Sequence, residues 1–315
     1  MHKPVEPAQF CDDVRSWPQI KVIGVPQNDL GLYLLHLIRR HRLYGPDRSY
    51  RHECGCIDNA VSRSELAAAS RRAEIVLQLG ECALEAGRPD SARAYAFWVE
   101  RGFTDGRGEG ILLEARAWEL RGPPDSALDA YERFLDAYGD SPSQAAVRFR
   151  RGMILERIDR WEQARSEFRA LAAEQPSHPL AFAALLRIVN HHAVRGERDL
   201  ARFEGRHGIE TLERLIATHG DPGVVFAARR TRAEVLLLIE DYAAASQAFA
   251  ELWSRYPETP AGMAAGVRAA QVAEQRLGDR RRALDLYRDL ATHATDLAVQ
   301  REARAAAARL ERAGG

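Results

Sequence analysis

A short cluster of histidine and cysteine side chains is the first place in the chain that could do chemistry. His52, Cys54 and Cys56 are close neighbours, and Cys11 with His41 could complete a set of nitrogen and sulfur donors of the kind that holds zinc. The Cys-x-Cys spacing is less typical of zinc sites than Cys-x-x-Cys, and Cys11 lies far away in the sequence. We therefore interpret these cysteines as free thiols in a loop. A disulfide involving Cys11 and a metal site are the alternatives, and we expect no cofactor.

Motifs that would indicate an enzyme are absent from the sequence. It contains no phosphate-binding Walker loop, no G-x-S-x-G nucleophile elbow and no H-E-x-x-H zinc pair. His191 and His192 are adjacent on a predicted helix, where successive side chains diverge by about 100°, so we interpret them as structural. We expect the protein not to be an enzyme. An enzyme centred on a metal site in residues 1–60 is the catalytic alternative, and it predicts bound zinc or iron.

The charge balance argues against a nucleic-acid partner. The chain has 45 lysine and arginine residues and 45 aspartate and glutamate residues, so its formal net charge is zero. Proteins that bind nucleic acids ordinarily carry a basic excess that displaces counterions from phosphate. The only lysines are Lys3 and Lys21. The abundant arginines either reflect codon usage or offer planar donors for carboxylates.

The sequence predicts no membrane span. No stretch reaches the roughly 20 apolar residues that a transmembrane helix needs, and the longest candidate, residues 30–38, contains His36. The residues after Met1 do not form the apolar core of a secretory signal. If Met1 is the native start, we expect the protein in the cytoplasm. Removal of a signal would instead place it in the periplasm or cell envelope.

The elements that must position any functional residue come from an internal repeat. Four segments carry an alanine, an aromatic residue four positions later and an apolar residue three positions after that. Spacings of four and seven place all three side chains on one helical face. The triplets are Ala127/Tyr131/Phe134, Ala164/Phe168/Leu171, Ala245/Phe249/Leu252 and Ala283/Tyr287/Leu290, with a weaker copy at Ala92/Ala96/Val99.

A second helix precedes each triplet in the expected unit. Twelve residues before the alanine stands a small residue in four of the five copies, namely Gly80, Ala115, Gly152 and Ala233, whereas the last copy has Gln271. Turns are expected near Gly87, Gly122, Asp159, Glu240 and Gly278. The triplet alanines at 92, 127 and 164 are 35 and 37 residues apart, and those at 245 and 283 are 38 apart. The gap of 81 residues between 164 and 245 leaves room for one longer unit.

This pattern resembles the tetratricopeptide repeat, over about four fifths of the chain. Pro176 and Pro257 stand where that repeat ends its second helix, and Pro142 stands three residues late. The units are slightly longer than the usual 34 residues. The segment at 255–260 is similar to the helix ends of bacterial envelope proteins of this family that scaffold membrane assemblies. The resemblance implies an all-α, right-handed solenoid of antiparallel helix pairs.

The resulting organisation is a non-repeat extension over residues 1–64, followed by about six helix pairs and a C-terminal capping helix over residues 65–312. The extension should contain a short extended segment at 20–25 and a helix to about His41. In the longer middle unit, residues 180–193 and 208–219 are predicted helices. Between them, residues 194–208 form either an inserted loop or extended helix end without a role, or a protrusion that contacts the partner.

The resemblance implies a protein or peptide partner bound in a concave groove lined by the first helix of each unit. Carried onto this sequence, the groove positions are Arg116, Glu119, Phe149, Met153, Arg157, Arg230, Glu234, Arg268 and Arg276. Phe149 and Met153 would be apolar anchors, and the arginines would bind carboxylates. The alternative is a structural subunit of a larger, perhaps membrane-associated, complex that docks through residues 1–64.

Overall fold

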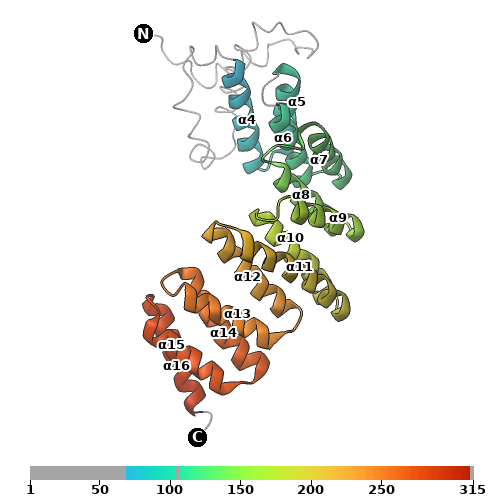
Figure 1. Ribbon diagram of the computed structural model, residues 1–315. Coiled ribbons are helices and arrows are strands. Elements are labelled where there is room, and N and C mark those ends of the chain that lie inside the picture. The colour runs from blue at the N-terminus through green and yellow to red at the C-terminus, as the bar shows by residue number, and fades with distance from the viewer. Residues whose placement is uncertain (1–68, 104–106, 313–315) are drawn as a thin grey trace, which may run out of the picture. The chain divides into compact units, whose positions relative to one another are not determined.

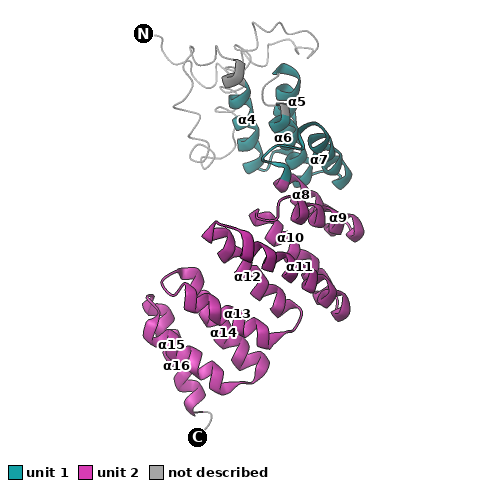
Figure 2. Ribbon diagram, viewed as in Figure 1, with its two compact units in different colours: residues 1–144 teal, residues 145–315 magenta. Residues whose placement is uncertain are grey.

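The computed structural model describes residues 69–103 and 107–312, and every regular element within these ranges is a helix (Figure 1). The chain divides into two compact units, residues 1–144 and 145–315 (Figure 2). The expected extension over residues 1–64 lies outside the described residues.

The described part of the first unit forms two helix pairs. Each helix packs against the next one along the chain, and α4 also packs against α6, so that the first helices of the two pairs are neighbours. The helices are α4 (Ala69–Glu85), α5 (Pro89–Gly102), α6 (Arg107–Leu120) and α7 (Pro124–Tyr138).

The second unit continues the same alternation of first and second helices. The pairs are α8/α9, α10/α11, α12/α13 and α14/α15, and α16 packs on α15. The helices are α8 (Gln144–Arg157), α9 (Trp161–Glu174), α10 (Pro179–Val194), α11 (Arg198–Thr218), α12 (Pro222–Leu238), α13 (Tyr242–Arg255), α14 (Pro260–Val272), the π-helix η4 (Ala273–Leu277), α15 (Arg280–His293) and α16 (Leu297–Arg312).

The turn inside most pairs is built in the same way. Four of the five predicted turn residues have a left-handed backbone, namely Gly87 (φ 66°), Asp159 (φ 62°), Glu240 (φ 64°) and Gly278 (φ 66°). A left-handed residue ends an α-helix and lets the chain reverse. Glycine adopts this conformation freely, whereas it costs other residues about 1–2 kcal/mol. The structure therefore confirms the predicted turns at these four positions.

The predicted triplets form the core. Every residue of the five copies is buried, from Ala92 at 0% exposure to Tyr287 at 5%. The small residue of the first helix makes room for a neighbouring helix. A Cβ atom on Gly152 would lie 2.4 Å from the ring of Phe168 on the second helix of the same pair, and one on Gly80 would lie 2.2 Å from Leu113 on α6, the first helix of the next pair.

The last helix pair, α14/α15, shows why no small residue stands at the expected position, Gln271. The first helix ends in the π-helical segment Ala273–Leu277, and a π-helix accommodates one extra residue. Counting back from Ala283, the small residue is therefore thirteen positions upstream instead of twelve. That position is Ala270, which is fully buried, and Gln271 is the next residue.

The middle repeat, formed by α10 and α11, has an extended second helix. Helix α11 begins at Arg198, so residues 198–208, which separate the two predicted helices, are helical. Of the alternatives, the structure shows an extended helix end and not a loop. Gly205 lets this helix approach α12 closely, because a Cβ atom there would lie 2.4 Å from Ile239.

Helix α16 covers the last pair. Ala303, Ala307 and Leu310 are buried in the core shared with α15. Arg309 donates to both carboxylate oxygens of Glu274, at 2.6 and 3.0 Å, which attaches α16 to η4. Arg280 donates to the carbonyl oxygen of Leu310.

Candidate partner-binding surface

The first-helix face of the second unit is the exposed side of α8, α10, α12 and α14 with η4. Each first helix packs one side against the buried triplets of the second helices. Its other side is exposed to solvent. The predicted groove residues on this face that are exposed are Met153, Arg157, Arg230, Arg268 and Arg276.

Charged residues of two first helices influence one carboxylate. Arg230 and Glu234 are one turn apart on α12 and form an ion pair at 3.6 Å. Burial raises the pKa of Glu234, while the positive charges of Arg230 and of Arg268 from α14 act in the opposite direction. The half-buried carboxylate of Glu234 is therefore paired with one predicted arginine and is influenced by the charge of a second.

The π-helix changes the register of Arg268. With the extra residue taken into account, Val267 and not Arg268 is the position equivalent to Phe149 and Arg230. Val267 is partly buried against the core of the last pair, and Arg268 is exposed. Arg276, within the π-helix, places its guanidinium 5.6 Å from the ring centre of Tyr242.

The two predicted apolar anchors differ in their exposure. Phe149 is partly buried, and its ring packs on that of Phe168 with 5.7 Å between centres. Met153 is 37% exposed. Phe149 therefore contributes to the core of its own pair, and Met153 offers more apolar surface to a partner.

Sequence reasoning missed one ion pair on this face. Arg187 of α10 donates to Glu156 of α8 at 2.6 Å and so links two first helices. Arg187 has no place in the predicted set because the middle unit breaks the repeat pattern. Counting back from the left-handed turn at Gly196 (φ 73°) does not recover it, because the positions equivalent to Arg230 and Glu234 are then Leu186 and Asn190.

The adjacent histidines lie beneath this face and are buried. The His191 ring stacks on Trp161 with 3.4 Å between centres and 2° between planes, and Nδ1 of His191 lies 3.6 Å from Glu156. His192 forms a 2.6 Å hydrogen bond with Glu197. Burial, followed by the positive charge of Arg195, lowers the pKa of His191.

The lowered pKa predicts acid sensitivity. Because the unfolded chain takes up a proton at His191 more readily than the folded chain, this histidine contributes stability that is present above its unfolded pKa of about 6.5 and is lost as the pH falls. The melting temperature should therefore decrease between about pH 7.5 and about pH 5.5. His191→Phe keeps the stacked ring and removes the titration, so its decrease should be smaller. Circular dichroism melts measure this, and an equally steep decrease in the variant would contradict the assignment.

The predicted groove residues of the first compact unit, Arg116 and Glu119, make contacts with neighbouring helices of that unit. Arg116 of α6 forms an ion pair with Glu81 of α4, which links the first helices of the two pairs. Glu119 accepts a hydrogen bond from the hydroxyl of Tyr131 at 3.0 Å. Both are partly buried, and each anchors a neighbouring helix.

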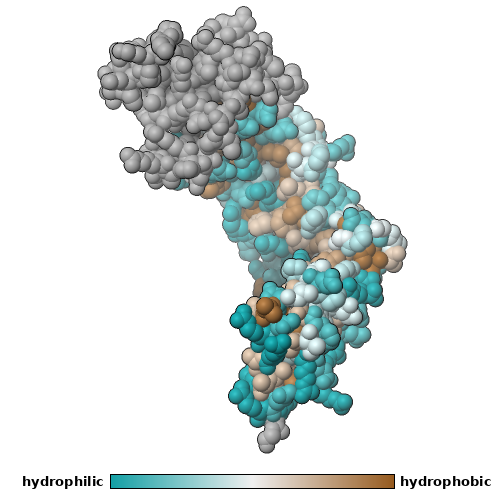
Figure 3. Space-filling view, turned by 90° about the vertical axis from the view of Figure 1, so that its left-hand side faces the viewer, coloured by the Kyte–Doolittle hydropathy of each residue, from teal (hydrophilic) through white to brown (hydrophobic). Residues whose placement is uncertain are grey.

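The metal candidates Cys11, His52, Cys54 and Cys56 lie outside the described residues. Within residues 69–103 and 107–312, no group of three or more histidine, cysteine, aspartate or glutamate side chains is placed to hold a metal ion. None of the helices in these ranges combines the length and the apolar character needed to cross a membrane. On the face that Figure 3 shows, hydrophilic side chains cover most of the coloured surface and hydrophobic ones form separate patches.

The pairs of antiparallel helices, the small residue facing a buried aromatic and the left-handed turn define an all-α, tetratricopeptide-like helical-repeat protein.

Comparison with known proteins gives similarities in structure only. The chain is similar to a tetratricopeptide repeat protein from Parabacteroides merdae, with 13% identity, a TM-score of 0.42 and coverage of 90% of this chain and 98% of that chain. PilW, a widely conserved type IV pilus biogenesis factor, is 19% identical, with a TM-score of 0.42 and coverage of 73% and 97%. Yeast Tom70 is 14% identical, with a TM-score of 0.33 and coverage of 94% and 66%. No protein-family model and no curated protein matches the sequence.

Proposed function

We propose that this protein is a non-catalytic adaptor that binds another protein or a peptide through the first-helix face of its second unit. The observation that carries the proposal is the group of Arg230, Glu234 and Arg268: Arg230 pairs with the half-buried Glu234, and the charge of the exposed Arg268 from the next repeat acts on the same carboxylate. Stacked helical repeats present extended surfaces of this kind to partners.

The chemistry of the cluster indicates what it binds. The planar guanidinium group binds carboxylates through paired hydrogen bonds, and the 3.6 Å ion pair to Glu234 leaves Arg230 with donors to spare. The exposed Met153 adds an adaptable apolar contact on α8. We therefore expect a partner segment that carries acidic side chains or a free C-terminal carboxylate. A nucleic acid fits poorly, because the chain has no basic excess.

The test compares two full-length variants with equal loss of charge. In Arg230→Gln/Arg268→Gln the proposed cluster loses both guanidinium groups. In the control, Arg202→Gln/Arg206→Gln, two exposed arginines are removed from α11, which is a second helix. Tagged wild-type protein identifies the partner by affinity purification from the native organism, and calorimetry then measures its dissociation constant with each form. Circular dichroism confirms that both variants are folded.

The proposal predicts that the cluster variant weakens binding by about tenfold or more, which corresponds to about 1.4 kcal/mol, and that the control does not. Equal binding by all three forms would refute it. If the partner is then lost on deletion of residues 1–64, the chain is a structural subunit docked through that segment, with or without a membrane-associated complex around it.

A further inference from the structure

The proposed function does not use a groove that lies between two second helices. It has a volume of about 740 Å³ and lies between α9 and α11, with Leu185 and Ile188 of α10 among its lining residues. The helices of the first-helix face do not line it, apart from α10. A groove of this size matches the range of binding sites in proteins, roughly 300–1,000 Å³.

One wall of the groove is apolar and exposed. Phe203 of α11 is 52% exposed and lines the groove together with Leu215 of the same helix and Ala172 and Ala173 of α9. The extended end of α11 supplies Phe203, because a second helix starting near residue 208 would not reach it. An aromatic ring left this exposed gains free energy when a partner side chain covers it.

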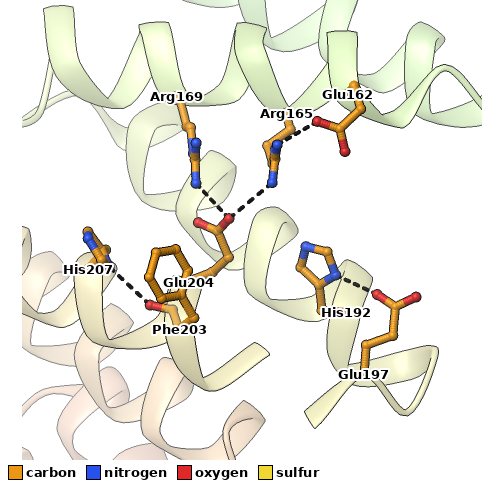
Figure 4. A network of polar contacts seen from close by, with 8 residues as sticks. All are labelled: Glu162, Arg165, Arg169, His192, Glu197, Phe203, Glu204 and His207. Carbon is orange, nitrogen blue, oxygen red and sulfur yellow. Dashed lines mark hydrogen bonds and ion pairs between the residues drawn. The ribbon is translucent and has the colours of Figure 1, made fainter. Parts of the chain in front are cut away.

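The other feature of the groove is positive charge. The single lining carboxylate, Glu204, is only 6% exposed and accepts hydrogen bonds from Arg169 at 2.6 Å and from Arg165 at 3.5 Å (Figure 4). Its charge is thus already balanced by α9. Arg214 also lines the groove, and its contacts are weak ones within α11, to the carbonyl of Glu210 at 3.4 Å and the hydroxyl of Thr211 at 3.3 Å.

From this combination we infer that the groove binds an acidic amphipathic helix of a second protein. An apolar residue of that helix would cover Phe203, and an aspartate or glutamate farther along the same face would pair with Arg214. Phe203 and Arg214 are eleven residues apart on α11, or about 16 Å along its axis, so about three turns of the bound helix separate the two contacts. Residues eleven apart lie on one face of a helix, as do residues three or four apart. The occupant is acidic because the arginines on the groove exceed its one compensated carboxylate.

The experiment selects ligands without assuming their sequence. A phage library of random peptides of about 15 residues, a length at which isolated helices begin to form, is selected on the immobilised full-length protein. Selected peptides are synthesised with a fluorescent label, and their anisotropy gives the dissociation constant. The groove variant is Phe203→Ser/Arg214→Gln. Its control, Leu200→Ser/Arg206→Gln, changes equally exposed residues of the same helix that do not line the groove.

The inference predicts that the selected peptides combine leucine or phenylalanine with an acidic residue about eleven positions away on the same helical face. Their binding should weaken by about tenfold or more in the groove variant and stay unchanged in the control. Selection of basic or purely apolar peptides, equal binding to the groove variant, or no selection at all would overturn it. Peptides that are lost only in Arg230→Gln/Arg268→Gln would also overturn it, and would support the first-helix face instead.

Discussion

Truncation of Phe168 to alanine is expected to lower the free energy of unfolding by about 3–5 kcal/mol. The Phe168 side chain is fully buried and fills the space opposite Gly152, so its removal leaves a cavity that the two helices cannot close. The ring also packs on that of Phe149, which would lose this contact as well. Urea unfolding followed by circular dichroism measures the change.

A matched control is available in the same unit. Phe203→Ala removes the same atoms from a side chain that is 52% exposed, and it should cost less than about 1 kcal/mol. If the two variants lost similar stability, Phe168 would not be the packing centre of its helix pair.

The second large effect concerns the buried carboxylate of Glu204. Replacing both of its partners, as Arg165→Met/Arg169→Met, leaves a charge that is 6% exposed without compensation, and this should cost about 3 kcal/mol. We expect the lower end of the usual range for a broken buried pair because the adjacent groove lets water approach. The same unfolding measurement applies.

The triple variant that adds Glu204→Met distinguishes this cause from lost packing. Replacing a whole buried ionic group with apolar residues of similar volume is often nearly neutral, so most of the stability should return. A triple variant as unstable as the double one would show that the arginines act through their aliphatic stems.

Most of the fold was predictable because the signal lies in local spacing. Ala164, Phe168 and Leu171 share one face of a helix for reasons of geometry alone, and all three are buried. The turns were equally predictable near Gly87 and Gly278. At Asp159 and Glu240 the repeat spacing located the turn; aspartate is one of the non-glycine residues that tolerate a left-handed backbone, and glutamate is not.

The features of the fold that could not be predicted lie where an irregular element changes the number of residues between equivalent repeat positions. The π-helix at Ala273–Leu277 adds a residue without a recognisable composition, so Ala270 and Val267 could not be aligned with their counterparts. The extended end of α11 is rich in charge and contains Gly205 and Gly208, which are typical of a loop. It is helical because Gly205 packs against Ile239, a contact that is not visible in local sequence.

The residues of the candidate surface were predictable only in repeats where the spacing between equivalent positions is regular. Arg230 and Glu234 follow from helical spacing, and their proximity to Arg268 depends on the packing of the next repeat. Arg187 and Glu156 lie 31 residues apart, and they meet because consecutive first helices are neighbours. The repeat register does not predict this pair, because alignment of the middle repeat by its turn at Gly196 places Leu186, and not Arg187, at the position of Arg230.

The polar outer side of α16 also determines how the chain behaves at high concentration. Without this helix, α15 would expose the apolar face that Ala303, Ala307 and Leu310 now cover, and that face is shaped to receive a further helix. A helix from another molecule could occupy it, and because such a head-to-tail contact does not close on itself, it would propagate into a fibre. Arg301, Glu302 and Arg312 are exposed on α16 instead, and Leu297 at the start of the helix is a large apolar side chain that it leaves exposed. The mainly charged outer side of α16 therefore disfavours such head-to-tail stacking.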